Sequence, residues 1–369
     1  MSNLDKQVEG KRKEIHTDAY PMSIGEVINL YVDGDLDIHP EFQRIYRWNQ
    51  GQKSRLIESI LLGIPLPSFF VAQREDGIWD VVDGLQRLST IFSFLGIYRN
   101  EEGQIEAPLK LTATDYLPEL EGMYWGDEIN ENHISKELQR AFKREKIDLK
   151  IIKKESDEHT KYELFQRLNT FGSSLSDQEV RNCLLIMINK PMYNWFTELS
   201  VNSDFISVFP LTSKQIDEQY NVELVLRFLA LKDTEISRVK GLSDIGDFLT
   251  KRMKEIATDL DFDMTLEREK LLKTFKILNL ALGDSAFKKY QNRRYLGAFS
   301  LSIFEVIGLG LGFNINDYDE NNPAHLAKVR EVSEQLLNNP DFVRNSGSGA
   351  RASSRLPHIL PMGRKLLEI

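Results

Sequence analysis

The sequence predicts an α+β fold, in which a mixed domain at residues 15–155 precedes an α-helical domain at residues 156–369. In the first hundred residues, short β-branched and aromatic runs alternate with helical patterns. From about residue 157 the helical period takes over almost completely. A chain of 369 residues also fits about two domains of ordinary length.

The first domain is expected to combine short strands with amphipathic helices. Strand-like runs, bounded by turn residues, occupy 36–40, 68–73, 78–82 and 147–154. Residues 74–77, with the sequence REDG, join the second run to the third as a hairpin. A helix is expected over residues 49–63, because its apolar residues share one helical face, and residues 99–130 are typical of an inserted loop.

The second domain is expected to contain about seven helices separated by Gly, Pro, Asn or Asp. The helical runs are 157–170, 176–190, 214–232, 242–257, 265–282, 294–309 and 323–338. Residues 345–355, with the sequence NSGSGARASSR, are flexible by composition.

Charge and composition limit the classes of function. The net charge of −9 and the pI near 5.4 mean that DNA contact requires a local basic patch. The single cysteine, Cys183, allows no intrachain disulfide, indicates a reducing compartment and is expected to be buried filler. No apolar run is long enough to span a membrane and the start lacks a signal-peptide core, so the expected location is the cytoplasm.

The stretch DVVDGLQRLSTIFSFL, residues 80–95, places three polar side chains where a strand passes into a helix. Gly84 permits a tight turn, and the first helical N–H groups favour an anion such as a phosphate. Arg87 can grip that phosphate, Gln86 can position a water or bond a base, and Asp83 can hold a metal ion or accept a proton. The alternative is that Asp83 only caps the helix and that Arg87 is a surface residue.

A second cluster lies upstream, in IHPEFQRIYRWNQGQ at residues 38–52. It places Gln43, Arg44 and Arg47 among aromatic side chains. Cations that alternate with aromatic residues suit stacking on a base and pairing with phosphate. The alternative is a loop with core aromatics and solvated arginines.

A third cluster spans residues 162–182. Arg167 and Asn169 lie on one predicted helix, and Ser176 with Glu179 forms a capping box for the next helix. The capping box is a structural signal. Arg167, Asn169 and Arg181 could face the first two clusters across the domain junction, where pockets commonly form.

Four blocks of the sequence, taken in order, resemble the DUF262 family, the N-terminal module of the GmrSD type IV restriction enzymes. The blocks cover about residues 20–190 and read PEFQRIYRW, GIPLPSFFV, DGLQRLSTI and FQRLNTFGSSLSDQEVRN. The resemblance implies a ParB/sulfiredoxin-like fold for residues 15–155. The family signature is Asp-Gly-Gln-Gln-Arg, and this chain departs from it at Leu85.

The resemblance implies a subunit that binds and hydrolyses nucleoside triphosphates (NTPs) and senses DNA in bacterial restriction or antiphage defence. Its cofactors would be NTP with Mg²⁺ or another divalent cation. The implied catalytic residues are Asp83, which would also hold the metal ion, Gln86 and Arg87. The implied nucleotide-binding residues are Gln43, Arg44, Arg47, Gly84, Arg167 and Asn169. No Gly-x-x-x-x-Gly-Lys-Ser/Thr sequence occurs, so a P-loop mechanism is not expected.

Nuclease activity of this chain alone is not expected. Fused relatives carry a metal-dependent nuclease that opens on His-x-x-Pro, but only eight residues follow the HILP sequence at 358–361. The six histidines show no metal-ligand spacing. The expected partners are DNA, either modified or from phage, and a separate nuclease or methylase subunit. No membrane partner is expected, and a homo-oligomer stays open.

Two other functions stay open at this point: a non-catalytic scaffold that binds DNA or nucleotide, and a metal-dependent DNA nickase. For DNA contact the sequence offers three basic stretches. Two of them are residues 11–13 and 143–154. The third is the glycine- and serine-rich segment with Arg344, Arg351 and Arg355, whose spaced arginines suit a phosphate backbone.

Overall fold

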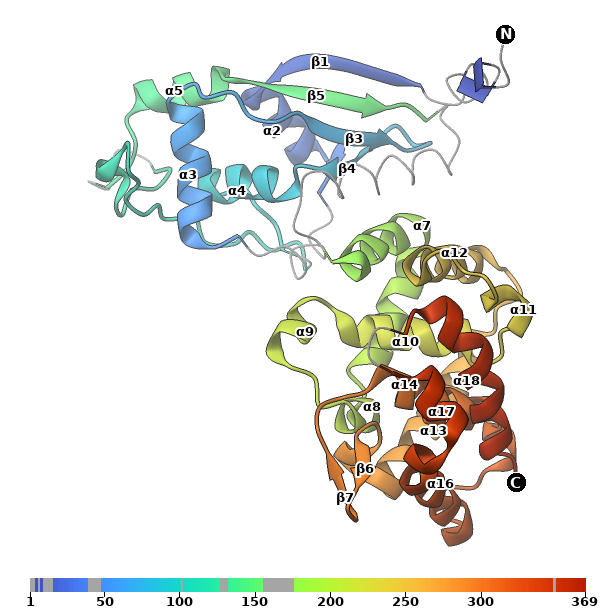
Figure 1. Ribbon diagram of the computed structural model, residues 1–369. Helices are drawn as coiled ribbons and strands as arrows, with labels where there is room; N and C mark the ends of the chain where they lie inside the picture. Colours follow the sequence, from blue (N-terminus) through green and yellow to red (C-terminus); the bar gives the residue numbers. More distant parts are fainter. Residues whose placement is uncertain are drawn as a thin grey trace. The chain divides into compact units, whose positions relative to one another are not determined.

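The computed structural model describes residues 4, 5, 7, 8, 16–38, 48–100, 102–126, 132–154, 176–347 and 350–369. The chain divides into two compact units, Met1–Ser174 and Leu175–Ile369 (Figure 1). A small sheet lies in the first unit and the second is mostly helical, which confirms the predicted α+β class. Residues 155–175 lie outside the described ranges, so the predicted boundary at residue 155 stays a prediction.

The first unit is built on a five-stranded mixed sheet with the strand order β1-β5-β3-β4-β2. β1 and β5 pair antiparallel, β5 and β3 parallel, β3 and β4 antiparallel, and β4 and β2 parallel. The strands are β1 Thr17–Ser23, β2 Leu36–Asp37, β3 Phe69–Gln73, β4 Trp79–Asp83 and β5 Lys146–Ile152.

Helices cover one side of this sheet (Figure 1). The helices of the first unit are α2 Ile24–Asp33, α3 Gln50–Leu61, α4 Leu85–Leu95 and α5 Lys136–Arg144. β5 shows that one face of the sheet is buried and the other exposed, because burial alternates along the strand with its pleat. Its inward side chains, which join the core, are Ile147, Leu149 and Ile151, and its outward ones are Lys146, Asp148 and Lys150.

Most of the predicted elements in the first unit are confirmed. The strand-like runs at 68–73, 78–82 and 147–154 form β3, β4 and β5, whereas the run at 36–40 gives only the two-residue β2. The predicted helix at 49–63 is α3, and Asn49 and Gln52 close its amino terminus as a capping box.

The sequence analysis missed β1, α2 and α5. β1 is an edge strand with five exposed residues, so it lacks the apolar alternation that marks a strand. α5 buries only Gln139 and Phe142 and otherwise consists of exposed, mostly charged residues. α2 does carry a helical signal in Ile24 and Val27, which are buried on one face.

The second unit consists of helices and one short hairpin. Its helices include α7 Asp177–Ser200, α8 Ser203–Val208, α9 Ser213–Asp217, α10 Tyr220–Leu231, α11 Ile236–Val239, α12 Ile245–Thr258, α13 Met264–Leu282, α14 Leu301–Ile303, the π-helix η4 Phe304–Gly308, α15 Leu309–Phe313, α16 Pro323–Gln335, α17 Pro340–Asn345 and α18 Ala352–Leu366. Aromatic rings gather in its core, where Phe209 contacts Phe205, Phe275, Phe287 and Phe304.

Two predictions for the second unit need correction. The helix expected over 294–309 begins instead as a hairpin of β6 Lys289–Gln291 and β7 Arg294–Leu296, joined by Asn292 and Arg293 with positive φ. The segment expected to be flexible, 345–355, is helical from Ala352 onward because α18 begins there. The HILP sequence lies inside the same helix.

One expectation about the second unit is confirmed. Cys183 is buried in α7 with 1% of its surface exposed, as expected of a core side chain. In the part of the chain that the structure describes, no helix is both long enough and apolar enough to cross a membrane.

Candidate functional site

The candidate site is the turn between β4 and α4. β4 ends at Asp83, Gly84 follows with φ 97° and ψ 11°, and α4 begins at Leu85. A Cβ atom on Gly84 would lie only 2.4 Å from Cδ1 of Phe69. Both the left-handed backbone and the close approach of β3 therefore require glycine at this position.

Arg87 is the side chain that holds this turn in place. Its Nη2 donates to Oδ2 of Asp83 at 2.9 Å and to the carbonyl of Ser68 at 3.2 Å, and its Nη1 donates to the carbonyl of Pro67. The guanidinium lies 4.3 Å from the centre of the Phe69 ring. Arg87 thus ties the motif to the segment that leads into β3, and the interpretation as a surface residue is wrong.

Burial and charge act in opposite directions on Arg87. Burial lowers the pKa of its guanidinium, and the negative charge of Asp83 raises it in part. The Asp83 side chain is 30% exposed, so a cation from solvent can reach it. Asp83 does not cap α4, because its carboxylate pairs with Arg87 and the cap position belongs to Gly84.

The amino terminus of α4 has no side-chain cap, and Gly84, Leu85 and Gln86 at its start are buried. No described side chain caps it, and the first backbone bond of the helix runs from Leu88 N–H to the Gly84 carbonyl. The N–H groups that precede this bond have no acceptor within the helix and carry the positive end of its dipole. A phosphate is the kind of group that this arrangement binds.

Gln86 connects the motif to the first sequence block. Its Oε1 accepts a hydrogen bond from the backbone N–H of Trp48 at 3.3 Å, and Trp48 is the last residue of PEFQRIYRW. The two blocks, 38 residues apart, therefore meet at this turn. Leu85, where the family signature has glutamine, is 5% exposed and belongs to the core.

Two further carboxylates of the sheet have a structural role that the sequence analysis missed. Arg74, in the turn between β3 and β4, pairs with Asp37 at 2.6 Å and with Asp80. Burial opposes the charge of Arg74, but the hydrogen bonds that its guanidinium donates to both carboxylates, and their negative charge, outweigh burial and raise the pKa of Arg74. Asp80 is thus paired with Arg74. Of the two aspartates of β4, Asp83 is the one that lies at the turn into α4.

The residues present suit a divalent ion that arrives with its substrate. Within the described ranges, no three His, Cys, Asp or Glu side chains gather as a metal site. Mg²⁺ is commonly held by one or two carboxylates together with substrate phosphates and water. Asp83 beside an uncapped helix terminus provides that kind of incomplete ligand set.

Five of the predicted nucleotide-binding residues lie outside the described ranges, and their roles stay predictions. They are Gln43, Arg44, Arg47, Arg167 and Asn169.

Arg181, which was considered with the third cluster, is buried inside the helical unit. Its Nη2 pairs with Glu223 of α10 at 2.7 Å, and its Nε donates to Gln178 at 2.8 Å. Arg181 therefore has a structural role within that unit.

The three arginines predicted to bind DNA have different surroundings. Arg344 is exposed and makes a long 3.7 Å ion pair with Asp341, and Arg351 is exposed before α18. Arg355 instead donates from Nε and Nη2 to both oxygens of Glu305, at 2.7 and 2.9 Å. Glu305 is fully buried, so Arg355 has a structural role and only the other two remain candidates for DNA contact.

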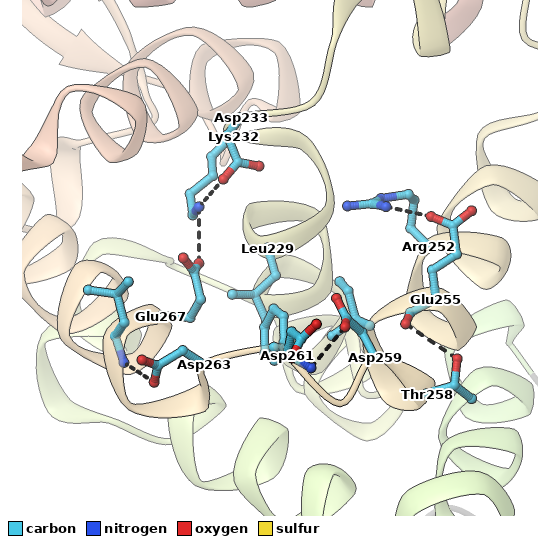
Figure 2. A pocket seen from close by; sticks show the side chains of 13 residues that line it. Leu229, Lys232, Asp233, Arg252, Glu255, Thr258, Asp259, Asp261, Asp263 and Glu267 are labelled. Carbon is cyan, nitrogen blue, oxygen red and sulfur yellow. Dashed lines mark hydrogen bonds and ion pairs between the residues drawn. The ribbon is translucent and has the colours of Figure 1, made fainter.

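A cavity of about 650 Å³ lies in the helical unit, between α10, α12 and the start of α13 (Figure 2). Six carboxylates and two cations line it: Asp233, Glu255, Asp259, Asp261, Asp263 and Glu267, with Lys232 and Arg252. Lys232 is paired with Asp233 at 2.6 Å and with Glu267 at 3.0 Å. This excess of negative charge repels phosphate, so the cavity does not suit an NTP.

Comparison with known proteins identifies one family. Residues 24–186 match the family described as GmrSD restriction endonuclease, N-terminal domain. The match begins at α2, includes the Asp83–Arg87 turn and ends within α7. No curated protein and no solved structure matches the chain. The family match confirms the resemblance noted in the sequence over this segment.

Proposed function

Because residues 24–186 belong to the GmrSD N-terminal domain family, we propose that the chain is a component of a bacterial restriction or antiphage system. In this proposal the first unit binds and hydrolyses an NTP at the Asp83–Arg87 turn, and the protein senses DNA. DNA cleavage or modification is the task of a separate nuclease or methylase partner.

The observation that supports this proposal is the combination of groups at one turn. An uncapped helix terminus, a partly exposed carboxylate and a buried guanidinium meet within five residues. Phosphoryl transfer mainly requires that charge on the phosphate oxygens is stabilised and that the attacking water is oriented. The turn supplies groups for both tasks.

Each residue of the turn has a distinct role in this proposal. The N–H groups at the start of α4 bind phosphate oxygens, and Gly84 supplies the left-handed backbone that the turn before them requires. Asp83 holds the divalent ion, which offsets the phosphate charge. Arg87 fixes the Asp83 carboxylate and adds positive charge beneath the turn. Gln86, oriented by Trp48, positions the attacking water.

Phosphate release from NTPs in the presence of Mg²⁺ tests the proposal. Asp83→Asn keeps the size of the side chain and removes its charge, and we expect at least a ~100-fold slower release, the order of effect of one electrostatic group. Asp115→Asn is the matched control, because Asp115 is an exposed aspartate of the same unit. Equal rates for wild type and Asp83→Asn would overturn the site assignment.

A non-catalytic nucleotide-binding scaffold is the second candidate. The observation that favours it is the buried Leu85, which places no amide at a position where the family signature has one. This candidate predicts that an NTP binds with Mg²⁺ and is recovered intact. Calorimetric titration combined with chromatography of the nucleotide separates the two candidates.

A further inference from the structure

The segment that forms α5 and β5 in the first unit carries a concentrated positive charge. Residues 136–154, which form α5 and β5, contain eight Lys or Arg and three Asp or Glu, although the whole chain has a net charge of −9. Seven of the eight cations are exposed and have no carboxylate within ion-pair distance in the described part of the chain: Lys136, Arg140, Lys143, Arg144, Lys146, Lys150 and Lys154. The eighth, Lys153, pairs with Asp18 at 3.2 Å.

The fold directs these cations to solvent. On β5, Lys146 and Lys150 point away from the core because Ile147, Leu149 and Ile151 occupy the alternate positions. Their Cα atoms are about 13 Å apart at the usual rise of a strand, which corresponds to about four nucleotides along one strand of DNA. Asp148, which lies between them, is the one acid on this row of β5.

We propose that the outward face of β5, a basic surface around Lys146 and Lys150, binds the sugar–phosphate backbone of double-stranded DNA. The inference deepens the proposed function and rests on it, since it names the surface through which DNA is sensed. Unpaired exposed lysines and arginines are the groups that contact phosphates without reading sequence.

The chemistry of the surface favours a duplex over a single strand. Single-stranded nucleic acid is usually held by exposed aromatic rings on which the bases stack. Two rings lie beside cations of α5 and β5: Phe70 of β3, 5.3 Å from Nζ of Lys150, and Trp125, 5.7 Å from Nζ of Lys143. Both rings are only partly exposed and already contact a lysine. Single-strand preference is therefore an outcome that would contradict the inference.

The basic surface is also close to the candidate site. Lys150 is the register partner of Phe70 on β3, and Phe70 is the register partner of Asp83 on β4. One row of the sheet thus leads from the DNA surface to the turn across two strand spacings, about 10 Å. This row is a short structural path between bound DNA and the nucleotide.

The test measures the affinity of the full chain for a 30-base-pair duplex by fluorescence anisotropy over a range of salt concentrations. The variant Lys146→Gln/Lys150→Gln removes two exposed charges. The matched control, Lys240→Gln/Lys251→Gln, removes two exposed and unpaired lysines of the helical unit.

The expected result is a change in the salt dependence of binding. Each lost phosphate contact reduces the slope of log K against log salt by about 0.9, so the double variant loses about 1.8. If the two proteins bind the duplex equally at 1 M salt, the variant binds it about 60-fold more weakly than the wild type at 0.1 M salt. The control keeps the wild-type slope, and the wild type binds the duplex more tightly than a single strand.

An unchanged slope in the variant, or the same loss in the control, would overturn the inference. NTP hydrolysis without DNA, measured on the same variants, distinguishes this failure from failure of the proposed function. If the wild type hydrolyses NTP and the variant binds DNA normally, the surface is wrong and the nucleotide site stands. If the variant loses DNA binding while the wild type hydrolyses no NTP, the DNA surface stands and the assignment of the nucleotide site is wrong.

Discussion

Substitution of Gly84 by alanine tests the structure of the candidate site. The backbone at Gly84 has φ 97°, a conformation that costs a residue with a side chain about 1–3 kcal/mol. The added Cβ would also lie 2.4 Å from Phe69, a fully buried ring that also contacts the Arg87 guanidinium. Overpacking of this kind costs about 1–3 kcal/mol. Gly84→Ala should therefore lower the free energy of unfolding by about 2–6 kcal/mol.

The control for this prediction is Gly63→Ala. Gly63 has a positive φ of 69° but no heavy atom within 4 Å of an added Cβ. Its replacement by alanine therefore carries the free-energy cost of the left-handed backbone without a steric clash. Urea denaturation followed by tryptophan fluorescence measures both variants, since three of the four tryptophans lie in the first unit. If Gly84→Ala costs no more than Gly63→Ala, the close approach of Phe69 to the turn is refuted.

Three further predictions concern the helical unit. Glu305→Gln removes the buried partner of Arg355 and should lower the free energy of unfolding by about 3–5 kcal/mol in a denaturation experiment. Glu198→Gln, at an exposed ion pair with Arg268, should leave the free energy of unfolding nearly unchanged. Burial raises the pKa of Tyr220 to about 12, so its phenolate should appear by ultraviolet titration only near pH 12. Because the folded state holds this proton more tightly than the unfolded state, stability should fall as the pH rises from 10 to 12. Burial also raises the pKa of the Cys183 thiol, so an aromatic disulfide reagent should react with it only after unfolding.

The turn at Gly84 could be predicted because its signals are local. A strand-like run, a glycine and a helical period follow one another within sixteen residues, and the structure places β4, the left-handed glycine and α4 there. The position of Arg87 was harder to predict. Its hydrogen bonds to Pro67 and Ser68 depend on β3 pairing beside β4, which is a long-range contact. The four-residue spacing of Asp83 and Arg87 was the one local signal for their ion pair.

Contacts in the helical unit show the same limit. Arg355 is separated from Glu305 by 50 residues, so its place in a glycine- and serine-rich segment suggested DNA contact. The β6–β7 hairpin was taken for helix because its turn is Asn292-Arg293, without the glycine that usually marks a two-residue turn with positive φ.

The most direct test of the central claim is to locate the nucleotide on the protein. Full-length protein is cross-linked to an azido-substituted NTP with Mg²⁺, digested and mapped by mass spectrometry, with excess unlabelled NTP as the competition control. We expect competable label within residues 48–95, which contain Trp48, the Asp83–Arg87 turn and α4. Label confined to residues 229–267, around the acidic cavity, would contradict the claim.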